Sequence, residues 1–294
     1  MWRSLVYNNL EDLFGDVVGK ARRGQELSMK YVTDALDIEL NDWKKLERYE
    51  WIPEKSTIAR IGGFLGLDIR KLQVCAKGGF FPLKPSGDSF SGLKVEMIRL
   101  YEDPNQQMDT MSMNGFLLIC SNTQKAAFID PGFEFRKIMG FIEKSNVILE
   151  KIFLTHGHYD HFTALRDLVQ ETGAEVYVSK KDAPMLSNEV NLVSEKLEGN
   201  ERIKIGEIDL RVAETNGHTP GGVSFIGQGF AFVGDALFAG SIGGTRKKES
   251  FNIQKSAVEY NILSLLNNTV LFPGHGPATT VGEERKNNPF YFFS

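Results

Sequence analysis

The chain has 294 residues, of which 41% are hydrophobic and 24% are charged, and its formal net charge at pH 7 is -4. This composition excludes a disordered chain. The negative net charge excludes a protein whose whole surface is built to bind polyanions, although a local basic face remains compatible with it.

The two cysteines, Cys75 and Cys120, form no CxxC pair, which favours a reducing compartment, and we interpret both as buried small hydrophobic residues. Charge appears too early for a signal peptide, and no run approaches the ~20 apolar residues of a membrane span. We therefore expect a cytoplasmic protein without a membrane partner.

The sequence pattern that indicates secondary structure changes about one third of the way along the chain. Residues 10 to about 75 are typical of short helices, whereas after about residue 93 apolar runs of strand length alternate with turns. Residues 77–92 are rich in Gly, Pro and Ser, as linkers are, and their phenylalanines indicate partial packing. We predict a helical domain at 1–78, a linker at 79–92 and a second domain at 93–294.

Helical spacing in the first segment predicts three amphipathic helices, at 29–36, at 40–49 and between Pro53 and Gly66. Ser28 is the expected N-cap of the first of them, and Gly66 is expected to end the third. Two short helices joined by a tight turn form a helix-turn-helix. Over residues 13–72 this spacing resembles the Cro/C1 (XRE-like) repressor domain.

The resemblance to that DNA-binding family breaks where DNA contact matters. The family usually follows its glutamate with glycine and a basic pair, but Glu47-Arg48 is followed here by Tyr49-Glu50-Trp51-Ile52. The second helix also begins with Glu39 and Asp42 at the end that would enter the major groove, which phosphate repulsion opposes. We expect weak DNA binding at most, and packing against the enzyme or a second subunit, including a homodimer, stays open. No DNA-contacting residue is assigned.

All five histidines of the chain lie in three motifs that are rich in potential metal ligands. His156, His158 and His161 share the first motif with Asp160, and the others are Gly-His218-Thr-Pro-Gly-Gly and Pro-Gly-His275-Gly-Pro. Strand-like apolar runs adjoin these motifs and Asp235, at 152–154, 223–226, 230–233 and 270–272. One rim of a sheet sandwich could therefore gather all of these groups. Imidazole is the commonest metal ligand, so the sequence predicts a metal site.

These motifs, in this order, resemble the metallo-β-lactamase superfamily over about residues 93–294. The resemblance implies an α+β fold, an αββα sandwich, in which two divalent ions bind, zinc first, with iron or manganese as alternatives. It implies that the ions are held by two sets of residues and bridged by Asp235: His156, His158 and His218 in one set, and Asp160, His161 and His275 in the other. A hydroxide between the ions would be the nucleophile, and Asp160 would take a catalytic role. Asp130, after a strand-like run, would orient histidine ligands from outside.

The segment from Asp235 to Gly244 resembles the short, glyoxalase II-like thiolester hydrolases. That group commonly continues with an arginine and an acidic residue, whereas this chain continues with Thr245 and then Arg246, Lys247 and Lys248. This basic run could hold a substrate carboxylate or could be a solvated loop. We expect no C-terminal helical extension of the kind with which larger hydroxyacylglutathione hydrolases bind glutathione.

The sequence thus predicts a metal-dependent hydrolase of a small-molecule thiolester or related acyl compound. Three alternatives stay open: a lactonase or other acyl hydrolase, a mononuclear iron persulfide dioxygenase, and a metal- or metabolite-responsive DNA-binding regulator.

Overall fold

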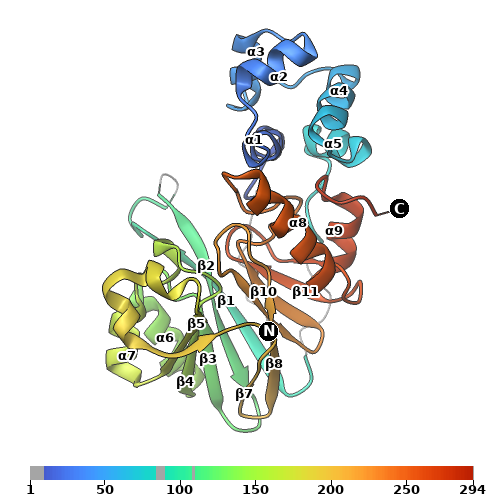
Figure 1. Cartoon of the computed structure of the whole chain (residues 1–294). Helices are drawn as coiled ribbons and strands as arrows, with labels where there is room; N and C mark the ends of the chain where they lie inside the picture. Colours follow the sequence, from blue (N-terminus) through green and yellow to red (C-terminus); the bar gives the residue numbers. More distant parts are fainter. Residues whose placement is uncertain (1–9, 84–89, 108–109, 294) are drawn as a thin grey trace.

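Two six-stranded sheets face each other in the computed structural model, which describes residues 10–83, 90–107 and 110–293 (Figure 1). The first sheet has the order β1 (Leu93–Tyr101), β2 (Ser112–Cys120), β3 (Lys125–Ile129), β4 (Ile148–Phe153), β5 (Glu175–Ser179) and β6 (Val193–Leu197). The second has the order β12 (Thr279–Thr280), β11 (Val270–Pro273), β10 (Phe230–Gly234), β9 (Val223–Gly227), β8 (Ile208–Glu214) and β7 (Arg202–Ile205).

Apolar side chains fill the space between the sheets. The ring of Phe116 lies 5.2 Å from that of Phe232 and 5.5 Å from that of Phe272, and Phe153 lies 4.8 Å from Phe225. All five rings are buried. Burial of each such side chain stabilises the fold by roughly 1.5–3 kcal/mol, so this layer holds the strand ends in fixed positions.

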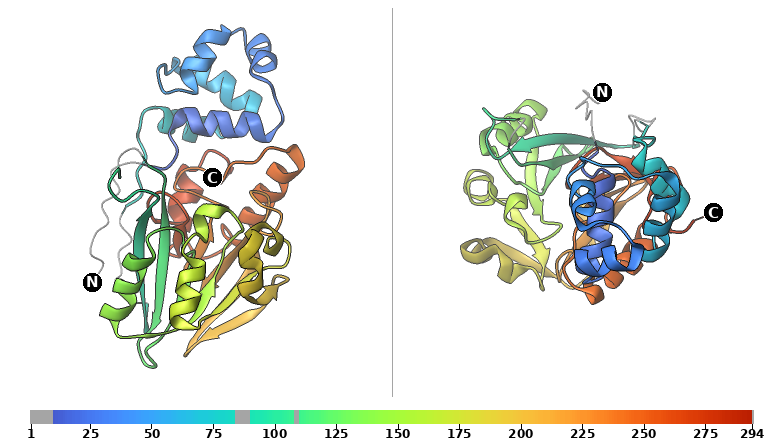
Figure 2. Two further views of the ribbon diagram at one scale, coloured as in Figure 1. Left: turned by 90° about the vertical axis from the view of Figure 1, so that its left-hand side faces the viewer. Right: turned by 90° about the horizontal axis from the view of Figure 1, so that it is seen from above.

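Helices cover the outer face of each sheet, which makes the four layers of an αββα sandwich (Figure 2). On the first sheet lie α6 (Phe135–Ser145), α7 (Leu165–Thr172) and the 3-10 segment η2 (Ala183–Leu192). On the second lie α8 (Lys248–Asn261) and α9 (Val281–Asn287). The predicted α+β sandwich is confirmed.

Five helices precede the sheets: α1 (Phe14–Gly24), α2 (Met29–Leu36), α3 (Leu40–Leu46), α4 (Lys55–Leu65) and α5 (Ile69–Ala76). Ser28 caps α2 as predicted, because its Oγ accepts a hydrogen bond of 3.1 Å from the Tyr31 amide. Gly66 ends α4 in the left-handed conformation, also as predicted. Helix α3 ends earlier than the predicted residue 49, since Tyr49 has a φ of 65°, which a helix cannot contain.

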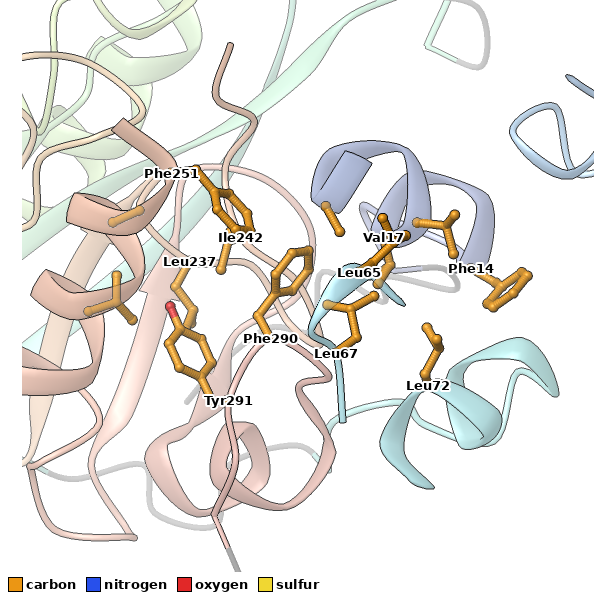
Figure 3. Close-up of a cluster of buried hydrophobic side chains, with 14 of the residues drawn as sticks. Phe14, Val17, Leu65, Leu67, Leu72, Leu237, Ile242, Phe251, Phe290 and Tyr291 are labelled. Carbon is orange, nitrogen blue, oxygen red and sulfur yellow. The ribbon is translucent and has the colours of Figure 1, made fainter. Parts of the chain in front are cut away.

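Helices α2 and α3 follow one another across a short turn, but the helix-turn-helix domain and its assignment to a DNA-binding family stay predictions. The N-terminal helices share one hydrophobic core with the outer layer of the second sheet. Figure 3 shows Val17, Leu65 and Leu67 of this helical unit facing the C-terminal part of the chain at Phe251 and Phe290. Polar contacts cross the same interface: the Asp68 amide donates to the Pro289 carbonyl (2.8 Å), and Lys71 Nζ donates to the Arg285 and Tyr291 carbonyls. The predicted domain boundaries at residues 78 and 92 stay a prediction.

The predicted linker is partly packed, as expected. Phe80 is buried, and the ring of Phe90 lies 5.0 Å from that of Phe230, whereas residues 84–89 lie outside the described residues. Cys120 is buried as predicted. The prediction for Cys75 was wrong: it is half-buried, because α5 turns Leu72 and Ala76 toward the core and leaves Cys75 at the edge of that face. In the described part of the chain, every helix is too short or too polar to span a membrane.

Candidate metal centre

The predicted ligand residues meet at one edge of the sandwich because two pairs of parallel strands end there. Strands β3 and β4 run parallel and lead to Asp130 and His156, and β10 and β11 run parallel and lead to Asp235 and His275. Parallel strands present their carboxyl ends at the same edge of a sheet. The loop between β8 and β9 adds His218 to this edge. The 3-10 turn η1 (Tyr159–His161), after the β4 loop, supplies two more of the predicted ligands.

The ligand atoms form three overlapping groups, in each of which they lie within 4.8 Å of one another. The groups are His156, His158 and His218; His156, His161 and Asp235; and Asp160, His161 and His275. The first and third correspond to the two ligand sets expected from the sequence, and Asp235 lies in the group between them.

Three histidine nitrogens converge on one point at this site, which is an arrangement that fits a cation. His156 Nε2 lies 3.1 Å from His158 Nδ1, which lies 2.9 Å from His218 Nε2. A single proton can form a hydrogen bond in only one of these two nitrogen pairs. In the other pair, a nitrogen lone pair is left facing another nitrogen lone pair. Two nitrogens each about 2.0–2.1 Å from one tetrahedral zinc ion would be about 3.4 Å apart, close to these separations.

Outward hydrogen bonds hold four of the histidine rings with Nε2 turned inward. The Nδ1 partners are the Thr155 hydroxyl for His156 (3.1 Å), Asp130 for His161 (3.0 Å), the Gly244 carbonyl for His218 (2.7 Å) and the Ser112 carbonyl for His275 (2.9 Å). A carbonyl or a carboxylate can only accept, so Nδ1 carries the proton where it meets one, and Nε2 keeps its lone pair for a metal. His158 differs, because its Nδ1 points inward.

Asp130 sits behind the histidines, where the sequence placed it. Its Oδ1 accepts from the Thr155 amide (2.7 Å), and its Oδ2 accepts from the Thr155 hydroxyl (2.7 Å) and from His161 Nδ1. The side chain is fully buried, and its backbone is held in the left-handed region at a φ of 53°. The geometry supports an orienting role for Asp130 toward both His161 and, through Thr155, His156.

Asp235 lies between the two ligand sets. Its Oδ1 is 3.4 Å from His161 Nε2, and its Oδ2 is 3.4 Å from His218 Nε2 and 3.6 Å from His275 Nε2. Oδ1 is buried and has no hydrogen-bond partner in the described structure. A buried carboxylate oxygen without a donor is costly unless a cation neutralises it, so this atom points to a bound metal ion. Gly274 makes the approach possible, since a Cβ there would lie 2.3 Å from Oδ1.

The charges of the metal-free site keep Asp235 ionised and His156 neutral, as metal ligands must be, but they favour the protonated form of His161 and His275. Burial opposes ionisation of Asp235, but His275, His161 and His218 outweigh it and lower the pKa of this carboxyl. Burial also lowers the pKa of His156 well below its usual range. At His275 burial acts in the same direction, yet Asp235 and Asp160 raise its pKa to about 10. Metal binding would therefore displace a proton from His275.

Asp182 is a residue that the sequence did not reveal. It is fully buried, its Oδ2 accepts from the Gly157 amide (3.1 Å) and the Thr219 hydroxyl (2.6 Å), and its Oδ1 accepts from the Gly221 amide (2.6 Å). It thus ties the loop of His156 and His158 to the loop of His218. Gly157 is needed for this approach, because a Cβ there would lie 2.9 Å from the Asp182 carbonyl oxygen. In the sequence, Asp182 is indistinguishable from an ordinary helix-capping aspartate.

Two buried amides hold the other ligand loops, and sequence reasoning missed both. Gln254 donates to the carbonyls of Ala236 (2.9 Å) and Gly243 (3.1 Å), and Asn114 donates to those of Pro273 and Gly276 (2.9 Å each). Each lies in a different element from the loop that it holds, so no local spacing could have identified it.

The basic run Arg246, Lys247 and Lys248 is exposed and leads into α8. It follows Gly244, whose carbonyl accepts from His218 Nδ1, so the run begins next to the site. The Lys248 amide donates to Glu26 of the helical unit (3.0 Å). A substrate role for these side chains stays a prediction.

Comparison with known proteins decides the family. Residues 115–275 match the family model of the Metallo-beta-lactamase superfamily. The chain belongs to the metallo-β-lactamase superfamily. Members of this superfamily bind divalent metal ions, and the chain is a metallohydrolase of this type. The N-terminal helices lie outside the matched residues.

Individual relatives point the same way. The chain is 30% identical to the hydroxyacylglutathione hydrolase GloC of Haemophilus influenzae over 191 residues, which cover 59% of this chain and 90% of the relative. It is 34% identical over 192 residues to a probable metallo-hydrolase of Streptococcus pyogenes, with 58% and 82% covered. Among solved structures, TTHA1623 in a di-iron-bound form is 29% identical with a TM-score of 0.52, and the match covers 66% of this chain and all of that one.

Proposed function

We propose that the chain hydrolyses thiolesters at a centre of two divalent metal ions, most simply zinc. One ion would be held by His156, His158 and His218, and the other by Asp160, His161 and His275, with Asp235 between them. The observation that carries this proposal is the buried, unpartnered Asp235 Oδ1 amid converging histidine nitrogens. Because seven protein residues would be shared between two ions, on average fewer than four for each, positions remain for water and substrate.

When bound, the ions would acidify water to a pKa of about 7 and polarise the acyl carbonyl. The residues of the chain would hold this arrangement in place. Asp130 and Thr155 fix the rings of His161 and His156, so the donor atoms need not reorganise during the reaction. Asp160, whose side chain is 18% exposed, lies at the open side of the site, where it could accept a hydrogen bond from the attacking water. Its pKa is lowered because His275 and His161 outweigh the effect of burial, so it remains ionised.

The thiolester substrate is proposed from the resemblance to short glyoxalase II-like enzymes and from the similarity to the hydroxyacylglutathione hydrolase of Haemophilus influenzae. Arg246, Lys247 and Lys248 are proposed to bind a carboxylate of the thiol part. Their exposure and their position directly after the His218 contact at Gly244 support this role. Cytoplasmic action is part of the same proposal.

Metal analysis of the purified protein, combined with an activity screen, tests the proposal. We expect two equivalents of transition metal per chain and hydrolysis of S-lactoylglutathione. Hydrolysis of lactones alone would indicate a lactonase, and oxygen-dependent consumption of glutathione persulfide with one iron per chain would indicate a dioxygenase. A well-folded preparation that binds no transition metal would refute the proposal.

A further inference from the structure

Glu11, among the described residues just before α1, lies against the loop that carries His275. Gly276, which follows His275, has a φ of 73°, and a Cβ built on it would lie 3.0 Å from Glu11 Cβ and 3.1 Å from the Glu11 amide nitrogen. A side chain at residue 276 would collide with Glu11, so glycine at this position leaves the space through which the backbone of Glu11 passes. Because the family model matches only residues 115–275, this wall of the site is an addition to the matched part of the chain.

Contacts of the residues that follow Glu11 hold this part of the chain in place. Asp12 is buried and forms an ion pair with Lys20 of α1, and Lys20 Nζ donates to the Ile242 carbonyl (2.9 Å). The same ammonium group lies 4.5 Å from the centre of the Phe238 ring, which in turn lies 5.7 Å from the ring of His275. Helix α1 thus anchors the segment to the loop that follows Asp235.

Among the residues that the structure describes, the carboxylate of Glu11 has no partner. Residue 11 is exposed, and within the described ranges its side chain forms no hydrogen bond or ion pair. Its contact with Gly276 nevertheless places Glu11 beside the residue that follows His275. Crowding by the surrounding chain raises the pKa of Glu11 itself, and His275 opposes this effect. Glu11 is thus an accessible anionic group at the rim of the metal centre.

We propose that Glu11 is a specificity-determining residue, which favours substrates with a cationic group on the His275 side of the scissile bond and disfavours anionic ones. The proposal rests on the proposed acyl hydrolysis at this centre. An unpaired charge beside a partly desolvated site attracts an opposite charge and repels a like charge, and both effects contribute to selectivity. The basic run after Gly244 starts from the other ligand set, at His218, so a substrate with charges of both signs would be held in one orientation.

Two thiolesters with the same acyl group test the preference: S-lactoylthiocholine, which carries a quaternary ammonium group, and S-lactoyl-3-mercaptopropionate, which carries a carboxylate. The rate of thiol release by the metal-loaded protein gives kcat/KM for each. Calorimetric titration with the two corresponding S-(2-hydroxypropyl) thioethers, which cannot be hydrolysed, measures binding independently of hydrolysis.

We expect Glu11→Gln to lower the ratio of kcat/KM for the cationic thiolester to kcat/KM for the anionic one by about tenfold relative to wild type, because the basic run after Gly244 is the same in both proteins. Glu11→Asp should retain most of the preference. Glu39→Gln removes an exposed carboxylate from the start of α3, which lies at the far end of the helical unit (Figure 1), and it should leave the ratio unchanged. Metal content and melting temperature should be unaltered in all three variants.

A ratio within twofold of the wild-type value in Glu11→Gln would overturn the inference. If neither thiolester is hydrolysed, the proposed reaction fails and the thioether titrations still decide the role of Glu11. A loss of cationic preference in binding would then support it, and equal binding by wild type and variant would refute it.

Discussion

Replacing Asp182 by asparagine tests how far the metal centre depends on a residue that touches no ligand side chain. The substitution keeps the shape but converts one acceptor oxygen into an amide group that donates. Oδ2 accepts from Gly157 and Thr219, and Oδ1 accepts from Gly221, so either orientation of the amide brings it against at least one donor. Each buried donor left unsatisfied costs roughly 1–3 kcal/mol. We expect the free energy of unfolding of the metal-free protein to fall by about 2–4 kcal/mol.

The same change should weaken metal binding, because Asp182 joins the loop of His156 and His158 to the loop of His218. Loss of an outer partner of this kind typically lowers metal affinity by about 10–100-fold. Urea unfolding of the metal-free protein measures the first effect, and competition with a chelator measures the second. Asp209→Asn, at an exposed position in β8, is the matched control and should change neither. An Asp182→Asn protein with wild-type urea midpoint and metal affinity would refute the reasoning.

Four further predictions address other parts of the chain. His161→Ala should lower the metal content from two ions to about one, measured by elemental analysis, and loss of both ions would show that the two sites are coupled. Changing Arg246, Lys247 and Lys248 to alanine should raise KM for S-lactoylglutathione at constant metal content, whereas an unchanged KM would indicate a solvated loop. Burial raises the pKa of Glu284 from its ordinary value of 4.5 to about 7. Between pH 4.5 and pH 7, the folded state therefore keeps a proton on Glu284 that the unfolded state has released. Stability from this group is therefore lost as pH rises between these values, by about 2–4 kcal/mol, and metal-free Glu284→Gln should lack that loss in urea unfolding at pH 5 and pH 8. Fluorescence anisotropy at physiological salt should show weak, unselective DNA binding by the full chain, and nanomolar selective binding would contradict this expectation.

The metal motifs were accessible to sequence reasoning because each stands beside its own strand. The run before His156 and the runs before Asp235 and His275 are continuous and apolar, so the strands and their ends could be placed from local pattern alone. Parallel pairing then brings these ends to one edge. The helix cap at Ser28 and the stop at Gly66 were predictable for the same reason, since both act within one turn of their own helix.

Residues that act across the fold were not predictable in this way. Asp182 and Gln254 carry ordinary polar side chains in helical segments, and their importance comes only from the backbone groups that the fold brings to them. The half-buried state of Cys75 similarly depends on which face of α5 meets the C-terminal part of the chain. The sequence pattern indicated that the first segment is helical and that the second contains strands, but it did not reveal the interface between the two segments.

That interface bears on what the helical unit does. A repressor-like domain that reads DNA is normally a separate body, whereas here α1 packs so closely on α8 that a Cβ at Gly24 would lie 2.4 Å from the Phe251 ring. Glu26 accepts from the backbone at the start of α8, and Lys20 holds the carbonyl of Ile242 in the loop after Asp235. Each end of the loop that carries the basic run is therefore in contact with α1 or with the turn that follows it. Movement of α1 would therefore also move the loop that follows Asp235 at the metal centre.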